Sequence, residues 1–240
     1  MKVLIVGASG MIGGEALIQC LAHPTITSVV AFVRRDLPAD VSDHPKLECV
    51  LVKDFAKWPE DVLKRHADAA AMIWAMGTYK GSQVVDLEYP LAFLESMARV
   101  LAETNPSRPR FRYVLLSGKF VRRNQEEKLW WGDKPRKIKG LLETKALAFA
   151  ENHPTMWETF IVRPGGVVPK KVIANGALGV VPAIGAVLGE NWTVRNEELG
   201  ALMVYLAING EGEDHIIENA RIVRRGRELL ESQNHRSDSK

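Results

Sequence analysis

Cysteine is scarce in this chain of 240 residues: it has only Cys20 and Cys49, and neither belongs to a CxxC pair. Two cysteines cannot form the disulfide framework of a small secreted domain, so a reducing compartment is expected. The first residues also lack the basic and apolar regions of a secretory signal. We therefore expect an intracellular, cytoplasmic protein.

Long hydrophobic runs and a strong charge excess are absent as well. The most apolar stretch, 176–189, contains Pro182 and is shorter than the roughly 20 residues that a membrane span needs. We expect it to pack against the body or to line a pocket. The net charge of +3 is too small to predict nucleic-acid or membrane binding by the whole surface, which leaves only a local patch for such roles.

Several catalytic motifs are missing. The six histidines form no HExxH or other metal-ligand spacing, and the chain has no GxxxxGK[ST] loop and no GxSxG elbow. Readings as a metalloenzyme, a P-loop nucleotidase or a serine hydrolase therefore have no support.

What the sequence does contain is a regular alternation of short apolar runs with amphipathic stretches. This rhythm is typical of an α/β fold, a doubly wound parallel sheet with crossover helices. We expect strands at 2–6, 28–33, 47–52, 69–75, 111–117 and 157–162, and helices at 11–22, 59–66, 84–102, 137–151 and 196–208.

The rhythm stops near residue 165, after which the chain is rich in Gly, Val and Ala and then in charge. We expect one Rossmann domain over 1–232. Within it, 165–210 forms a small substrate-side extension, and 233–240 is a flexible tail.

The strongest motif is GASGMIG, between the first strand and the first helix. Gly7 would permit the tight turn, Gly10 the approach of a pyrophosphate, and Gly13 close packing of the helix on the sheet. The backbone amides of this segment, which also includes Ser9, Met11 and Ile12, would hold the phosphate charge.

The second strand ends in Arg34 and Arg35, where an NAD-binding protein would carry an acidic residue for the ribose hydroxyls. A guanidinium pairs well with a 2′-phosphate, so these residues favour NADP. The alternative is that both arginines are solvated and Asp36 reads the ribose.

Two further loops would border the cofactor. Asp54 and Phe55 follow the third strand, where the next loop would pass the adenine. The run of Ala75, Met76 and Gly77 follows the fourth strand and would pass the nicotinamide ribose.

The segments GASGMIG, VRR, KDF, AMGT, LLSG, KGLLE and FIVRPGG resemble the atypical short-chain dehydrogenase/reductase superfamily, and within it the NmrA-like and Tat-interacting-protein-like branches. The resemblance covers about residues 1–168. It implies a Rossmann domain with a parallel sheet of about seven strands that binds NADP. Some such proteins reduce carbonyl or alkene substrates, and others bind the cofactor without established turnover.

By this resemblance Ser117 matches the catalytic serine and Lys139 the lysine of the Tyr-xxx-Lys motif, but Pro135 stands at the tyrosine position. A reductase would then need a substitute proton donor, for which Tyr79, Ser117 itself and Asp133 are candidates.

Lys139 and Ser117 could each have a purely structural role instead. Lys139 and Glu143 are spaced as an i,i+4 ion pair of an exposed helix, and Ser117 could cap the strand end through a backbone hydrogen bond. Arg163 is expected near the cofactor cleft, where it would hold an acidic substrate group or an internal carboxylate.

Two features after the fifth strand bear on the substrate and on partners. Trp130 and Trp131 could form the floor of a flat apolar substrate pocket, or they could be partly buried structural residues. Residues 119–145 carry nine Lys/Arg against four acids, a basic segment that could attract an anionic substrate or a protein partner, or simply be solvated.

These observations favour an NADP-dependent oxidoreductase acting on a small organic substrate. The alternatives are a non-catalytic NADP-binding regulator with a protein partner, and a non-redox isomerase with a bound cofactor. A homodimer is compatible with all three.

Overall fold

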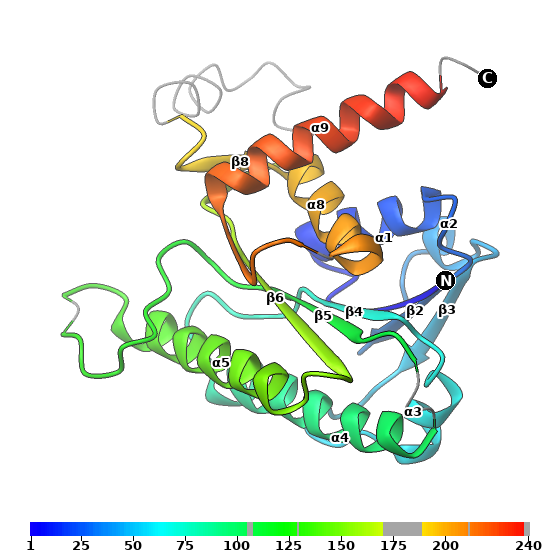
Figure 1. Ribbon diagram of the computed structural model, residues 1–240, viewed down its shortest axis with the longest axis horizontal. Helices are drawn as coiled ribbons and strands as arrows, with labels where there is room; N and C mark the ends of the chain where they lie inside the picture. The colour runs from blue at the N-terminus through cyan, green and yellow to red at the C-terminus, as the bar shows by residue number, and fades with distance from the viewer. Residues whose placement is uncertain (105–107, 129, 170–188, 211, 238–240) are drawn as a thin grey trace.

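The computed structural model describes residues 1–104, 108–128, 130–169, 189–210 and 212–237. Its centre is a sheet of seven parallel strands in the order β3-β2-β1-β4-β5-β6-β9 (Figure 1). The strands are β1 (Lys2–Val6), β2 (Ser28–Val33), β3 (Leu47–Leu51), β4 (Ala71–Trp74), β5 (Phe111–Leu116), β6 (Trp157–Arg163) and β9 (Ile216–Glu218). This is the predicted α/β fold class, with the predicted number of strands.

The central strands are apolar on both faces because helices cover both sides of the sheet. In β1, Val3 and Ile5 point into one half of the core, while Leu4 and Val6 point into the other, and none of the four is exposed. The alternation follows from the two-residue period of a strand.

Helices form a layer on each side of the sheet (Figure 1). One layer contains α1 (Met11–Ala22), α2 (Ala39–Ser42), α8 (Asn196–Asn209) and α9 (Asn219–Ser237). The other contains α3 (Glu60–Arg65), the π-helical turn η1 (Val84–Glu88), α4 (Tyr89–Thr104) and α5 (Asp133–Asn152). The chain therefore winds in both directions from β1, and β4 lies beside β1.

A small second sheet pairs β7 (Gly166–Val168) with β8 (Thr193–Arg195). The fully buried Asn219 joins it to the C-terminal helix. Its amide nitrogen donates to the carbonyl oxygens of Glu190 and Thr193 at 2.6 and 2.8 Å, and its oxygen accepts from the Gly165 amide at 2.7 Å. The apolar stretch 176–189 lies outside the described residues, apart from Gly189.

Differences from the predicted elements concern short or irregular pieces. The strand pattern did not reveal β7, β8 and β9, which have three residues each. The predicted helix at 84–102 begins with the π-helical turn η1, and the one at 137–151 begins four residues earlier, at Asp133. In the expected tail, α9 continues to Ser237, and 238–240 lie outside the described residues.

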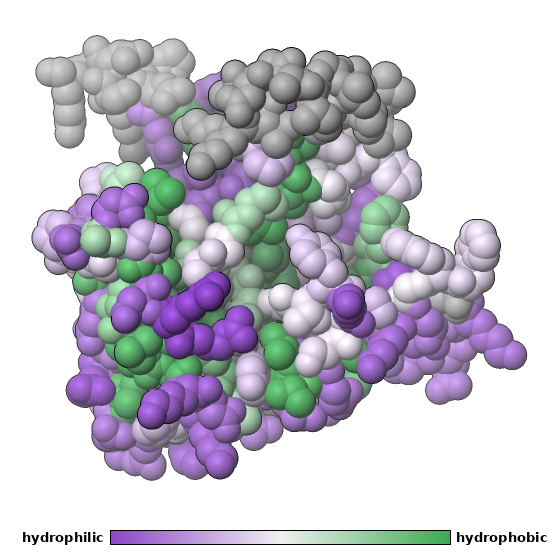
Figure 2. All heavy atoms as spheres, turned by 180° about the vertical axis from the view of Figure 1, so that it is seen from behind, coloured by the Kyte–Doolittle hydropathy of each residue, from purple (hydrophilic) through white to green (hydrophobic). Residues whose placement is uncertain are grey.

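The surface mixes charged and apolar residues, as Figure 2 shows for the face seen from behind. The loop between β5 and α5 stands out from the body, on the left of Figure 1 and on the right of Figure 2. Among the described residues, no helix has the length and apolar character required to cross a bilayer.

Candidate cofactor and active site

The candidate site is a cleft at the carboxyl ends of the central strands. It lies where the chain reverses its winding direction, between β1 and β4, which is where open α/β sheets bind their ligands. Its lining comes from the turn after β1, the end of β2 and the loops after β3 and β4. The lining residues are Gly7, Ala8, Ser9, Gly10, Phe32, Val33, Arg34, Phe55, Ala75, Met76 and Gly77.

The turn after β1 has room for glycine alone at two positions. Gly7 has a φ of 91°, and a Cβ there would lie 2.6 Å from the carbonyl carbon of Ala75. A Cβ on Gly13 would lie 2.2 Å from the Gly7 carbonyl oxygen. The Gly10 amide donates to that same oxygen at 2.9 Å and closes the turn. The chain thus brings the first turn of α1 directly beneath the cleft.

The start of α1 is suited to an anion. The N-cap residue Gly10 makes no side-chain capping hydrogen bond, and the first turn holds no acidic residue. Helix N-termini carry unpaired backbone amides and partial positive charge. Met11 and Ile12 form the beginning of this first turn. The Met11 carbonyl accepts from Asn196 Nδ2 at 3.0 Å, and the Ile12 side chain packs against the core.

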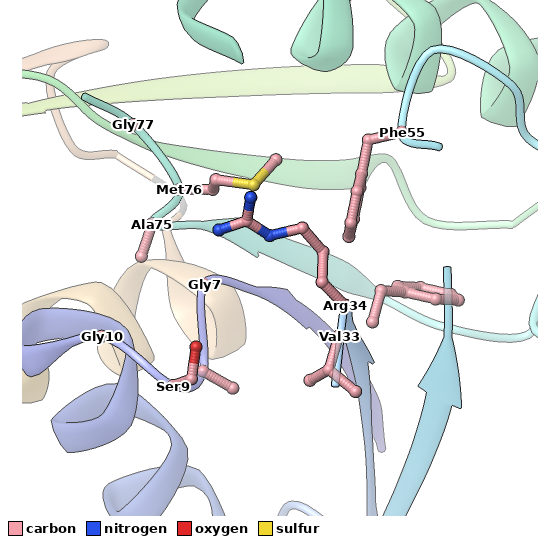
Figure 3. Close-up of a pocket in the computed structure, with 11 residues that line it drawn as sticks. Gly7, Ser9, Gly10, Val33, Arg34, Phe55, Ala75, Met76 and Gly77 are labelled. Carbon is pink, nitrogen blue, oxygen red and sulfur yellow. The ribbon is translucent and has the colours of Figure 1, made fainter. Parts of the chain in front are cut away.

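Arg34 is the charged side chain in the lining of the cleft. Figure 3 shows it reaching across the opening toward Met76, with Phe55 on the far wall. Arg35 and Asp36 are exposed, and neither belongs to the lining. Asp54 also lies outside the lining, where its carboxylate accepts the amide of Ala56 at 3.0 Å.

Lys139 extends from α5 to Gly77, one of the residues that line the cleft. A Cβ on Gly77 would lie 2.8 Å from its Nζ. The ammonium donates to Asp86 Oδ1 at 3.0 Å, and the Asp86 side chain is fully buried. The sequence therefore placed Lys139 near the cleft but gave it the wrong partner, since the expected i,i+4 pair with Glu143 is absent.

Asp86 holds the loop after β4 by its own hydrogen bonds. It accepts from the amides of Thr78 and Ser82, both at 2.7 Å, and from the Thr78 hydroxyl. Burial alone raises the pKa of Asp86, but the bonds from Thr78 and Ser82 and the charge of Lys139 reverse this effect, so that the pKa is lowered. Asp86 is therefore an ionised anchor for both the loop and the lysine.

A second buried carboxylate, that of Glu143, lies on α5 one turn after Lys139 and has no exposed side-chain surface. It accepts from Ser117 Oγ at 2.6 Å, from Arg123 Nε at 3.0 Å and from Arg163 Nε at 3.0 Å. Arg163 Nη2 donates to it as well, and Arg163 Nη1 donates to Glu218 at 2.9 Å. Ser117 and Arg163 thus meet at one internal carboxylate.

This network bears on the alternatives weighed for Ser117 and Arg163. Ser117 bonds through its side chain to Glu143, not through a backbone cap. Arg163 is held by the internal carboxylate of Glu143 and by the exposed one of Glu218, and its hydrogen bonds to Glu143 raise its pKa. Of the two roles weighed for Arg163, the structural one is observed.

None of the four tyrosines, all of which are among the described residues, lines the cleft. Tyr113 lies in the core, where burial raises its pKa well above the ordinary value. Tyr79 is 97% exposed, and the ring of Tyr205 lies 4.5 Å from the guanidinium carbon of Arg225. Tyr89 packs against Phe55 with ring centroids 5.9 Å apart. Asp133, another candidate donor, pairs with Lys137 at 3.0 Å.

Neither residue of the tryptophan pair lines the cleft. The relative exposures of Trp130 and Trp131 are 101% and 69%, which places both indoles in solvent on the protruding loop. The basic segment 119–145 is also less free than its charge suggests. Four of its cations are paired with carboxylates, namely Arg122, Arg123, Lys137 and Lys139.

The sequence did not reveal the importance of Asp86 or Glu143. Asp86 stands between Val85 and Leu87, and Glu143 follows Leu142. Both side chains face inward. A carboxylate on the apolar side of a helix was the available signal, because such a group is seldom buried without partners. The described residues contain no group of three or more side chains that could hold a metal ion.

Comparison with protein families finds no family model that matches the chain. A curated relative, the mitochondrial protein FMP52 of Saccharomyces cerevisiae, is 23% identical over 228 residues, which cover 90% of this chain and 91% of the relative. The name of this relative conflicts with the cytoplasmic location expected from the sequence, and that expectation is wrong.

Solved structures share the fold over most of the chain. A short-chain dehydrogenase/reductase family oxidoreductase from Burkholderia thailandensis superposes with a TM-score of 0.64 at 15% identity and covers 97% of this chain and 96% of its own. Gre2 from Candida albicans, solved with NADPH, gives 0.64 at 15% identity and covers 91% and 78%. The chain therefore has the Rossmann fold of the short-chain dehydrogenases/reductases, in agreement with the resemblance seen in its motifs.

Proposed function

We propose that the chain is an NADP(H)-dependent oxidoreductase acting on a small organic substrate. The observation that carries this proposal is the position of Arg34, which follows β2 and enters the cleft. A guanidinium offers five donors and no acceptor, so it suits a 2′-phosphate and not the two ribose hydroxyls of NAD. Proteins of this fold have been solved with NADPH and with NAD, so the fold alone does not choose between them.

The residues of the cleft fit such a cofactor. The amides at the start of α1, next to Gly10, would hold the pyrophosphate, and Phe55 would flank the adenine. Lys139, fixed by Asp86 beside Gly77, would hold the nicotinamide ribose. When bound, the nicotinamide supplies or accepts a hydride.

Binding is tested by titrating NADPH and NADH against the full chain while following the quenching of tryptophan fluorescence. We expect one NADPH per chain, bound at least about tenfold more tightly than NADH, a difference of about 1.4 kcal/mol. A panel of carbonyl compounds would then be added and NADPH oxidation followed by absorbance. Absence of NADPH binding would overturn the proposal.

A non-catalytic NADP-binding regulator is the second candidate. It is favoured by Pro135, which occupies the position of the proton-donating tyrosine and has no proton to give. Stoichiometric NADPH binding without oxidation by any carbonyl or alkene compound would support this candidate over the oxidoreductase.

A further inference from the structure

The Ser117–Glu143 contact has a direction that follows from the partners of Glu143. Its two oxygens accept from Arg123 Nε and from Nε and Nη2 of Arg163. These groups are donors only, because an arginine in a protein does not lose its proton. Both oxygens of Glu143 therefore already act as acceptors, toward groups that can only donate.

The proton in the 2.6 Å contact therefore belongs to Ser117. A serine hydroxyl has one proton and two lone pairs. Once the proton is committed to Glu143, the remaining hydrogen-bonding capacity of Ser117 is that of an acceptor. Among the hydrogen bonds found between described residues, none is donated to Ser117 Oγ, so its lone pairs stay available.

A second hydroxyl, that of Thr78 in the loop after β4, is also bonded to a buried carboxylate. Thr78 Oγ1 donates to Asp86 and accepts the Ser82 amide at 3.1 Å. Its proton and one of its lone pairs are therefore engaged inside the protein. Lys139 donates one N–H to Asp86 and retains two further N–H donors for a ligand. Ser117, in contrast, offers only lone pairs.

We propose that Glu143 is a positioning residue that makes Ser117 a hydrogen-bond acceptor toward the ligand. The ligand group that meets Ser117 is then a donor, such as the hydroxyl of an alcohol, and not a carbonyl oxygen. The part that concerns the substrate rests on the proposed oxidoreductase function. The orientation of the Ser117 hydroxyl does not, because it follows from contacts within the chain.

Neutron diffraction from deuterium-exchanged crystals tests the orientation directly. We expect the Ser117 deuteron between Oγ and Glu143 Oε1, and no deuteron on Glu143, both without cofactor and after soaking with NADP. A deuteron that points away from Glu143, or one on the Glu143 carboxyl, would overturn the proposal. This result is obtained whether or not NADP binds, so failure of the proposed function is recognised separately.

Infrared spectroscopy of protein with ¹³C-labelled glutamate carboxyls gives a second readout in solution. Ser117→Ala removes one donor from Glu143 and is expected to shift one carboxylate band. Thr78→Val is the matched control, since it removes a hydroxyl from Asp86 and leaves the labelled glutamates untouched. An unchanged glutamate spectrum in Ser117→Ala, or an equal change in both variants, would contradict the assignment.

Substrate kinetics address the ligand. For an alcohol and carbonyl pair that the protein interconverts, Ser117→Ala should raise the KM of the alcohol by about tenfold, the loss expected for one hydrogen bond. The KM of the carbonyl compound should change less than twofold. A larger effect on the carbonyl compound would show that Ser117 donates.

Discussion

The backbone of Gly13 packs directly against the carbonyl group of Gly7, at a distance that leaves no space for a side chain. This contact fixes how closely α1 approaches the end of β1, and with it the position of the helix N-terminus below the cleft. The glycine turn is thus also a packing contact of the fold.

Gly13→Ala is expected to lower the free energy of unfolding by about 1–3 kcal/mol, as overpacking does in a filled core. Urea denaturation measures this loss. Gly118→Ala is the matched control, because a Cβ at Gly118 would meet its nearest neighbour, Val121, only at 4.0 Å. Equal stabilities of the two variants would show that the turn can relax.

Arg34→Ala should weaken NADPH binding by about 10- to 100-fold, the loss of a charge-assisted contact worth about 1.5–3 kcal/mol. NADH binding should change little, because NADH lacks the 2′-phosphate. Fluorescence titration of both nucleotides measures the effect. Arg35→Ala serves as the control, since Arg35 lies outside the lining of the cleft. A parallel loss for NADPH and NADH in Arg34→Ala would refute the role of this arginine.

Asp86→Asn should destabilise the protein by about 1–3 kcal/mol at pH 7, because an amide cannot accept all the hydrogen bonds made to this buried carboxylate. Asp68→Asn, which affects an exposed ion pair with Lys2, should cost less than about 1 kcal/mol. Urea denaturation of both variants gives the comparison.

The stability effect of the same variant is expected to depend on pH. The folded-state pKa of Asp86 is lowered below its ordinary value of 3.8, so its contribution to stability is complete above that value. It is lost as the pH falls through the folded-state pKa. The difference in unfolding free energy between wild type and Asp86→Asn should therefore shrink in strong acid. A difference that grows on acidification would contradict the lowered pKa.

Glu143→Leu is expected to cost about 3–5 kcal/mol, because it leaves the inward-facing arginines Arg123 and Arg163 without their buried partner. Thermal and urea unfolding measure this cost. Glu60→Leu is a suitable comparison, since Glu60 forms an exposed pair with Lys64 and its loss should matter little. Similar behaviour of the two variants would indicate that the Glu143 network does not stabilise the fold.

The local sequence pattern was sufficient to predict much of the fold. The ends of β1, α1 and β2 agree with the sequence expectation to the residue, since apolar periodicity and the glycine turn mark them within a few positions. A strand as short as β9 has no such pattern. Its place at the sheet edge depends on pairing with β6, more than 50 residues earlier in the chain.

In the candidate site as well, local features could be predicted from the sequence and distant partners could not. The glycine turn and Arg34 are local features next to strand ends, and they lie where the sequence indicated. The partner of Lys139 is Asp86, 53 positions away, and the partners of Glu143 come from β6 and from the loop after β5. An i,i+4 spacing could not reveal these partners, because tertiary packing decides which carboxylate is buried.

The loop after β4 and the start of α5 touch at Gly81 and Pro135. Gly81 has a φ of 75°, and a Cβ there would lie 2.6 Å from Pro135 Cα. An engineer who wished to reinstall the phenol by Pro135→Tyr would therefore place a large ring on a backbone already pressed against a neighbouring loop. That single replacement would have to move the loop before it could restore a proton donor, so converting this site to the common dehydrogenase chemistry requires coordinated changes in both segments.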